Sequence, residues 1–191
     1  MPREVRIIGG LWKRTKLPVA DRPGLRPTPD RVRETLFNWL WQDLGGWRCV
    51  DAFAGTGALG LEAASRGAAQ VLLVERDAAL VKQLISLQAR LGAQGVRIAS
   101  GDGIAALRQL PPGSVDLVFL DPPFDAALVE PALQAAAPVL AQGGLVYLEA
   151  PQVWDDERLA PFGLSVQRHL KAGAVHAHLL RRASPPSGAI I

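Results

Sequence analysis

Between residues 48 and 150, short apolar runs alternate with segments of helical character. Each run is rich in Val, Leu and Ile and has the length of a single buried strand. The five runs are RCVDAFA (48–54), AQVLLVE (69–75), GVRIAS (95–100), VDLVFL (115–120) and GLVYLEA (144–150). One intervening segment, 78–91, carries leucines at helical spacing, at Leu80, Leu84, Leu87 and Leu91. The alternation predicts an α/β fold in which a parallel sheet has helices on both faces.

The two ends of the chain depart from this alternation. After Pro161, two runs around a glycine-containing turn predict a closing antiparallel pair of strands, at 164–170 and 174–182. We expect the main domain to cover residues 49–182 and the last residues, 183–191, to form a flexible tail. Residues 1–48 predict a short hairpin and a helix, which together form an extension packed onto that domain.

The extension has its own local signals. The hairpin, over 5–19, is expected to have glycines at its turn or bulge. Thr28 is placed to cap the helix, with Pro29 in its first turn and Asp30 at the positive end of its dipole. The apolar face of the helix is predicted to hold Val32, Leu36, Trp39 and Leu40. The polar side chains expected to point elsewhere are Arg31, Arg33 and Asn38.

The composition excludes several classes of protein. With 191 residues, 49% of them hydrophobic and 20% charged, the chain fits one globular domain. No apolar run approaches the roughly 18 residues that span a bilayer, and the N-terminus has no apolar signal core. We therefore expect a cytoplasmic protein without membrane contact. Cys49 is the only cysteine, which excludes an internal disulfide and a multi-cysteine zinc site.

The three histidines, His169, His176 and His178, lie close together near the C-terminus. His176 and His178 alternate on a predicted strand and so share a face. A metal site would need further ligands, and the sequence favours ordinary surface histidines over metal ligation. We predict no metal site.

The net charge of +3 is distributed unevenly. Residues 1–48 hold ten Lys or Arg against five Asp or Glu, whereas the rest of the chain has a small acidic excess. An excess of positive charge at one end of a chain suggests a polyanionic partner. Charge alone favours this interpretation no more than a solvated basic surface. The alternation of Lys and Arg with Trp12 and glycines is what a phosphate-contacting arm requires.

A glycine-rich loop follows the first predicted strand. Gly55, Gly57 and Gly60 satisfy G-x-G-x-x-G, and Glu75 ends the next strand twenty residues after Gly55. In dinucleotide-binding proteins such glycines admit a pyrophosphate and the acid binds ribose hydroxyls, so a nicotinamide dehydrogenase is one interpretation. Asp51, just before the loop, counts against it, because a carboxylate there would repel the diphosphate.

Acids at the ends of three successive predicted strands favour a different cofactor. Asp51 suits a cofactor with a positive charge and an ammonium group, and Asp102 is placed to accept from an adenine amino group. Together with Glu75 they are expected to line one crevice, because the carboxyl ends of parallel strands meet at one edge of a sheet. The sequence therefore predicts S-adenosylmethionine (AdoMet) as the cofactor.

The fourth strand ends in an acid, two prolines and an aromatic ring, Asp121, Pro122, Pro123 and Phe124. The prolines keep the backbone extended and fix the direction of the Pro122 carbonyl. Asp121 and this carbonyl can accept both N–H bonds of an exocyclic amino group, and Phe124 can stack on the base, for roughly 1–3 kcal/mol. The target nucleotide must be unpaired or flipped out to reach such a site. The motif indicates amino-group methylation.

Segments over nearly the whole chain resemble the RsmD family of bacterial small-subunit ribosomal RNA guanine-N2 methyltransferases. They are RIIGGLWKRTKLPV (6–19), LRPTPDRVRETLFNWL (25–40), DAFAGTGALGLEAASRGA (51–68) and FLDPPF (119–124). The resemblance implies a class I AdoMet-dependent methyltransferase fold, a Rossmann-like, mostly parallel sheet of seven strands with an antiparallel last strand. It also implies AdoMet as methyl donor. The implied substrate is guanine 966 of 16S ribosomal RNA in an assembled or partly assembled 30S subunit.

The matching positions give three sets of predicted site residues. The cofactor-binding set is Asp51, Phe53, Gly55, Thr56, Gly57, Gly60, Glu75, Arg76, Asp102 and Gly103. The catalytic, base-holding set is Asp121, Pro122, Pro123 and Phe124. The RNA-binding set is Arg6, Lys13, Arg14, Lys16, Arg26, Arg31 and Arg33. Two features depart from the family pattern: Thr56 stands where serine is common, and the last predicted strand lacks a tyrosine.

Three alternatives stay open from the sequence. A DNA or RNA adenine-N6 methyltransferase would share the fold and the logic of the D-P-P-F motif, although such enzymes usually begin it with Asn. A nicotinamide enzyme would share the glycine loop. A non-catalytic RNA-binding assembly factor would share the basic extension but has no need of both motifs. We expect a monomer.

Overall fold

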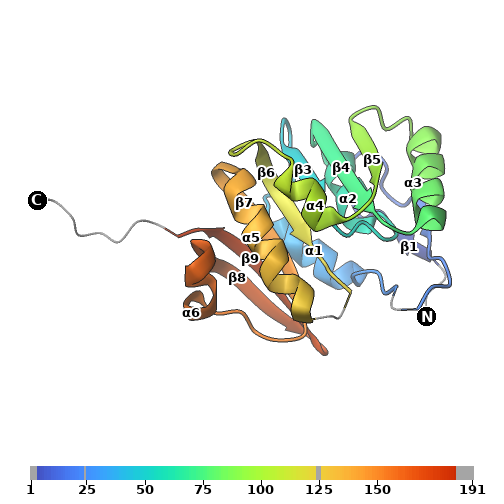
Figure 1. The fold of residues 1–191 in the computed structure, drawn as a ribbon. Helices are drawn as coiled ribbons and strands as arrows, with labels where there is room; N and C mark the ends of the chain where they lie inside the picture. The colour runs from blue at the N-terminus through green and yellow to red at the C-terminus, as the bar shows by residue number, and fades with distance from the viewer. Residues whose placement is uncertain (1–3, 24, 124–125, 184–191) are drawn as a thin grey trace, which may run out of the picture.

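A seven-stranded sheet forms the centre of the computed structural model, which describes residues 4–23, 25–123 and 126–183 (Figure 1). The strand order is β5-β4-β3-β6-β7-β9-β8. The bounds are β3 (Arg48–Asp51), β4 (Gln70–Glu75), β5 (Val96–Ser100), β6 (Val115–Leu120), β7 (Leu140–Ala150), β8 (Leu164–Ala172) and β9 (Val175–Arg182). Strands β3 to β7 pair in parallel, and β9 runs antiparallel to both β7 and β8. The predicted parallel sheet and the closing antiparallel pair are confirmed.

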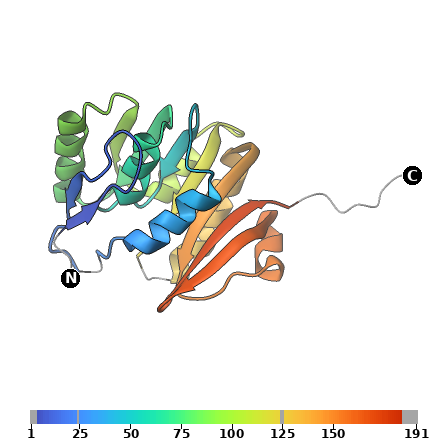
Figure 2. The ribbon, with the colours of Figure 1, turned by 180° about the vertical axis from the view of Figure 1, so that it is seen from behind.

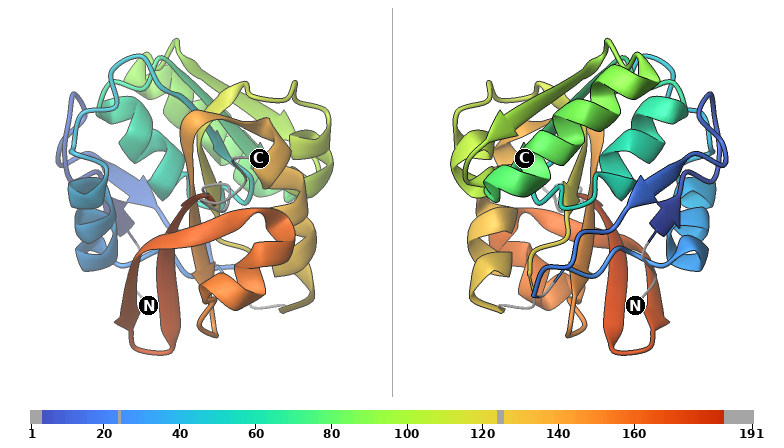
Figure 3. Two further views of the ribbon diagram at one scale, coloured as in Figure 1. Left: turned by 90° about the vertical axis from the view of Figure 1, so that its left-hand side faces the viewer. Right: turned by 90° about the vertical axis from the view of Figure 1, so that its right-hand side faces the viewer.

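Helices cover both faces of this sheet, as Figure 3 shows. The helices are α1 (Asp30–Trp39), α2 (Ala58–Ser65), α3 (Ala78–Leu91), α4 (Gly103–Arg108), α5 (Val129–Val139) and α6 (Asp156–Leu159), with short 3₁₀ turns at Ala126–Leu128 and Ala160–Phe162. Side chains of α1, α2 and α3 share one hydrophobic core with the sheet, and those of α4, α5 and α6 share the other. None of the helices in the described ranges is both long and apolar enough to cross a membrane.

Helix α3 shows how local sequence sets these layers. Asp77 caps its N-terminus by accepting hydrogen bonds from the backbone N–H groups of Ala79 and Leu80, and Gly92 ends it in the left-handed conformation. The leucine stripe predicted for this segment faces the sheet, where Leu80, Leu84 and Leu87 are buried. Apolar burial of one helical face thus fixes the helix on the sheet.

The N-terminal extension packs onto the same face as α2. Its hairpin, β1 (Glu4–Arg6) with β2 (Lys16–Pro18), and helix α1 lie over the sheet in Figure 2. Buried side chains of the hairpin and of α1 belong to the core that continues into the sheet. The extension therefore adds to one existing core instead of forming a second one.

The glycines of the hairpin bring its backbone against α2 and do not form an exposed arm. Leu11 N–H donates to the Ser65 carbonyl over 2.7 Å. Gly10 has φ +75°, and a Cβ there would lie 1.9 Å from the same carbonyl oxygen. A Cβ on Gly9 would lie 2.6 Å from the Arg66 guanidinium. At Gly10, where the close atom is a backbone oxygen and φ is positive, only glycine fits.

The prediction for the start of α1 is wrong in two respects. Pro29 occupies the N-cap position and no side chain caps the helix, whereas the Thr28 hydroxyl turns toward the carboxyl ends of the strands. Arg33, expected to point away from the core, is fully buried. Local helix signals placed both residues, but each has a partner from a distant part of the chain.

One of the three histidines, His178, differs from the prediction of ordinary surface residues, whereas His169 is exposed as predicted. His178 is fully buried and its Nε2 accepts from the backbone N–H of Trp154 over 3.0 Å. Burial lowers the pKa of His178 to about 4, so its ring is neutral at pH 7. The His169 and His176 rings stack with centroids 5.2 Å apart. Within the described part of the chain, no group of three or more His, Cys, Asp or Glu side chains is arranged to hold a metal.

Candidate active site

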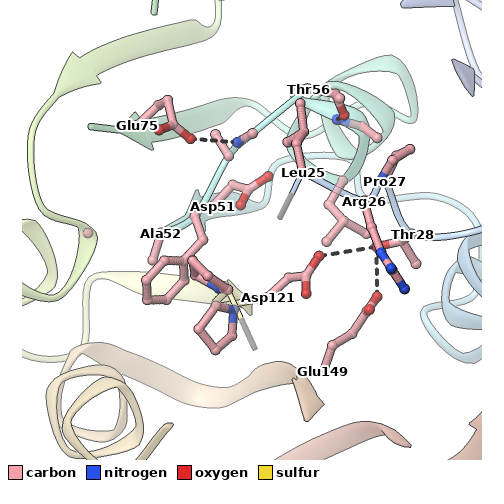
Figure 4. Close-up of a pocket in the computed structure, with 18 of the residues that line it drawn as sticks. Leu25, Arg26, Pro27, Thr28, Asp51, Ala52, Thr56, Glu75, Asp121 and Glu149 are labelled. Carbon is pink, nitrogen blue, oxygen red and sulfur yellow. Dashed lines mark hydrogen bonds between the residues drawn. The ribbon is translucent and has the colours of Figure 1, made fainter. Parts of the chain in front are cut away.

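A cavity of about 860 Å³ lies at the carboxyl ends of the parallel strands (Figure 4). Strand β3 pairs with β4 on one side and with β6 on the other, so the strand order reverses here. The helices that follow these strands leave toward opposite faces of the sheet, which opens a crevice at this point. The extension supplies one wall of the cavity, through residues 22–23 and 25–29.

The glycine loop is held by Glu75. The Gly55 N–H donates to Glu75 Oε2 over 2.9 Å, and the Asp77 N–H donates to Oε1 over 2.8 Å. Gly55 has φ +53° and lines the cavity beside Thr56, Phe53 and Arg76. Four of the predicted cofactor residues, Phe53, Gly55, Thr56 and Arg76, therefore line the cavity together.

Two predicted cofactor residues, Gly57 and Gly60, do not line the cavity. Gly57 begins α2 with φ +80°. A Cβ on Gly60 would lie 2.2 Å from the Leu73 side chain, so this glycine lets α2 pack closely on β4. The third glycine of the dinucleotide pattern has that same packing role.

Asp51 combines burial with an unsatisfied acceptor. Its Oδ2 accepts from the Gly60 N–H over 3.1 Å, whereas Oδ1 is buried and has no hydrogen-bond partner among the described residues. Burial raises the pKa of Asp51 to about 7, against the lowering effect of the nearby Gly60 and Phe53 backbone N–H groups. An ammonium group in the cavity would satisfy this oxygen and stabilise the charged form.

Asp102 and Gly103 form the wall below β5. Asp102 caps α4 by accepting from the Ala105 N–H over 2.7 Å, and it also lines the cavity. A Cβ on Gly103 would lie 1.8 Å from the Ala52 carbonyl oxygen. Glycine is therefore required for α4 to begin this close to β3.

Asp121 follows the last residue of β6 and lines the same cavity. Pro122 is buried and Pro123 is exposed, and both line the cavity. Phe124 lies outside the described residues. Enclosure by protein raises the pKa of Asp121 well above its usual value, and the nearby Glu149 and Asp51 carboxylates raise it further.

Thr28, Tyr147 and Glu149 also belong to the site, although they are absent from the predicted set. The Thr28 hydroxyl lies 2.7 Å from Glu149 Oε1 and 3.4 Å from Asp121 Oδ2. Dashed lines in Figure 4 mark both interactions. The Tyr147 hydroxyl donates to the same Glu149 oxygen over 2.7 Å. The alternation of Tyr147 and Glu149 along β7 was the available signal, because it puts both side chains on one face.

Three carboxyl groups thus converge in the cavity, and we refer to Asp51, Asp121 and Glu149 as the acid cluster. None of them forms an ion pair with a described residue. Burial raises the pKa of Glu149 too, while hydrogen bonds from Thr28 and Tyr147 oppose the shift. The cluster is built to receive positive charge or N–H donors.

A second buried group of charges, the arginine cluster, comprises Arg33, Glu62 and Arg66. Glu62 accepts from Arg33 Nη1 over 3.3 Å and from Arg66 Nε over 2.8 Å. It also accepts from the backbone N–H groups of Ile8 and Gly9, each over 2.8 Å. Arg33 is therefore buried and bonded to Glu62, so it is not available to contact RNA, contrary to the prediction. The other residues of the predicted RNA-binding set are exposed: Arg6, Lys13, Arg14, Lys16, Arg26 and Arg31.

Comparison with known proteins shows the family to which this chain belongs. The model of the family described as Conserved hypothetical protein 95 matches residues 5–181. Ribosomal RNA small subunit methyltransferase D of Escherichia coli K12 is 44% identical over 181 residues, which cover 94% of this chain and 90% of that protein. The chain belongs to the RsmD family.

Other RsmD-family comparisons agree. The protein of the same name from Haemophilus influenzae is 38% identical over 182 residues, covering 92% of this chain and 93% of that protein. A solved structure entitled putative methyltransferase yhhF from Escherichia coli superposes with a TM-score of 0.80 at 39% identity, covering 94% of this chain and 98% of that one. The fold is that of class I methyltransferases, which confirms the fold predicted for this RsmD-family chain and implies AdoMet as cofactor.

Proposed function

We propose that this protein transfers a methyl group from AdoMet to the exocyclic N2 of one guanine in 16S ribosomal RNA. The observation that carries the proposal is the placement of Asp121 and Pro122 beside a cavity suited to AdoMet, with no cation paired to the acids among the described residues. The names of the RsmD-family relatives support ribosomal RNA as the substrate class.

The residues present fit AdoMet. The unpartnered Oδ1 of Asp51 suits its ammonium group, and the glycine loop leaves room for its methionine part. Glu75 and Asp102 line the cavity at the neighbouring strand ends and would accept from the ribose hydroxyls and the adenine amino group. When bound, AdoMet supplies an electrophilic methyl group on a positively charged sulfur.

The chain itself holds the base. Asp121 and the Pro122 carbonyl accept the two N–H bonds of the amino group, so that the nitrogen lone pair is directed toward the cofactor. The lone pair of such an amine is delocalised into the ring, and positioning is therefore the main source of rate. Asp121 also offsets the positive charge that develops on the nitrogen. We assign Phe124, which lies outside the described residues, to stacking on the base.

The exposed basic residues of the extension supply the contacts to the RNA backbone. Arg26 lines the cavity, whereas Arg6 and Lys16 face each other across the hairpin register. Phosphate contacts by such residues position an RNA without reading its sequence. We infer an assembled or partly assembled 30S subunit as substrate, with guanine 966 as the target.

The test is methyl transfer from labelled AdoMet to three substrates: unmethylated small ribosomal subunits, naked 16S RNA and DNA. We expect label in N2-methylguanosine, on the subunits or on their RNA. Label in adenine or in DNA would retain amino-group methylation and refute the guanine assignment. Binding of AdoMet without any label would favour a non-catalytic assembly factor, and binding of NADH would favour a nicotinamide enzyme.

A further inference from the structure

Glu149 occupies a position that the chemistry of Asp121 and Pro122 leaves without a role. It lies near the carboxyl end of β7, is 8% exposed and lines the cavity that holds Asp121. The Thr28 hydroxyl touches both carboxyl groups, so they are neighbours in space although they come from different strands. A base with its amino group at Asp121 would bring an adjacent ring atom to Glu149.

The orientation of Glu149 is fixed by its partners. The hydroxyls of Thr28 and Tyr147 both meet Oε1, each at 2.7 Å. Arg33 Nε in turn donates to the Thr28 carbonyl over 3.2 Å, which holds that residue in place. No described residue donates a hydrogen bond to Oε2. A fixed carboxylate with one oxygen left over is an acceptor for a ligand.

The Watson–Crick edge of guanine matches such an acceptor. Beside its 2-amino group guanine carries N1–H, a second donor, whereas the atom beside the 6-amino group of adenine is an acceptor nitrogen. Hydrogen bonds to an ionised acceptor are about twice as strong as neutral ones. A buried carboxylate that faces the acceptor nitrogen of adenine is left unpaired. The cost of leaving it unpaired disfavours the binding of adenine.

We propose that Glu149 determines specificity for guanine by accepting its N1–H, while Asp121 and Pro122 hold the neighbouring 2-amino group. This inference rests on the proposed function and deepens it. Thr28 and Tyr147 are positioning residues for Glu149. The extension thereby takes part in base selection, because Thr28 belongs to it.

The variant Glu149→Gln tests the proposal with little change of shape. The amide oxygen keeps the two hydroxyl partners, and the amide NH₂ replaces the acceptor Oε2 with a donor. The substrates are reconstituted small subunits whose 16S RNA carries either guanine or 2-aminopurine at the nucleotide that the parent protein labels. 2-Aminopurine keeps the 2-amino group but has an acceptor nitrogen in place of N1–H.

The expected result is a reversal of preference. For guanine, kcat/KM of Glu149→Gln falls by on the order of 100-fold or more, because a site built to pair one hydrogen-bond group rejects its opposite. For 2-aminopurine, kcat/KM equals or exceeds that of the parent. Tm stays at or above the parent value, and the Kd for AdoMet stays near that of the parent. Tyr147→Phe removes one partner of Oε1 but leaves Oε2 as an acceptor, so it lowers kcat/KM for guanine by less than Glu149→Gln does and does not reverse the preference.

The opposite results distinguish the specificity role of Glu149 from the proposed function. Equal losses on both bases, or an unchanged rate on guanine, would overturn the role of Glu149 and leave the proposed function intact. A parent protein that labels a nucleoside other than guanosine would remove the proposed function, and the inference with it.

Discussion

The acid cluster and the arginine cluster are both buried groups of charge, and the segment from Thr28 to Arg33 touches both. In the arginine cluster, Glu62 receives four hydrogen bonds and faces two guanidinium groups. Among the described residues, the acid cluster brings three carboxyl groups together with hydroxyl and backbone donors only. One cluster is complete within the chain, and the other is incomplete without a ligand.

The difference separates a structural role from a functional one. A fully paired buried charge contributes to a unique fold, and the loss of either partner is costly. Unpaired acids cost stability in the free protein, and a ligand that carries positive charge or N–H donors recovers that cost. Substitutions in the two clusters should therefore have opposite effects on stability and on activity.

The largest effect is expected at Asp121. Asp121→Ala removes the acceptor for the amino group, so methyl transfer should fall below detection while AdoMet still binds. Calorimetric titration with AdoMet, together with the labelling assay, measures both quantities. Retained turnover would exclude Asp121 from the mechanism.

Glu62→Gln should destabilise the fold more than any single change in the acid cluster. It leaves Arg66 buried without a carboxylate and leaves Arg33 only its ion pair with the exposed Asp30. Breaking a buried ion pair typically costs about 3–5 kcal/mol. Urea unfolding followed by tryptophan fluorescence measures the change. A loss below about 1 kcal/mol would mean that the arginine cluster is not the structural anchor that its contacts indicate.

Asp51→Asn is the matched change in the acid cluster and should act in the opposite direction. The folded-state pKa of Asp51, about 7, exceeds the usual value of 3.8, so the parent loses stability as pH rises from about 4 to 7. The variant lacks this loss and should be more stable at pH 8 by up to about 4 kcal/mol, with little difference at pH 4. Its affinity for AdoMet should fall. A stability difference that does not depend on pH would contradict the raised pKa of Asp51.

Thr28→Val should shift the pH dependence of the reaction without removing it. The pKa values of Asp121 and Glu149 are raised by burial, so the rate should rise with pH as their protons leave. The Thr28 hydrogen bonds lower both pKa values, and their loss should move the rising limb to higher pH. Initial rates from pH 6 to 9 test this, with Thr28→Ser as the control that retains the hydroxyl. If the rising part of the pH–rate profile did not move, Thr28 would not control the pKa values of Asp121 and Glu149.

The smallest effect is expected at the exposed basic surface, which belongs to neither cluster. The double change Lys13→Glu and Lys16→Glu should weaken RNA binding and reduce the log–log salt slope by up to about 2. Arg168→Glu, on the exposed part of β8, is the control for charge reversal. Identical salt titrations for all three proteins would refute the phosphate-contacting role.

The sequence predicts those features whose signals are local. The hydrophobic period locates the strands, and the glycine spacing locates the loop after the first of them. The two prolines mark the end of the strand that precedes Asp121. Parallel topology then brings Asp51 and Asp121 to one crevice. Thr28 and Arg33 differ from the prediction because their partners lie on β7 and α2. The alternation of Tyr147 and Glu149 shows that they share a face of β7, but it does not show that this face meets Thr28 of the extension.

The distances along the chain between these partners have a consequence for how the protein acquires its activity. Arg33 and Glu62 are separated by 29 positions, whereas Thr28 and Glu149 are separated by 121. Closing the longer loop costs about 1 kcal/mol more in chain entropy, and it must await the synthesis of β7. During translation the arginine cluster can therefore assemble while the contact between Thr28 and Glu149 is still missing. Catalytic competence is a late event of folding, and a nascent chain that already has much of its core has no complete site.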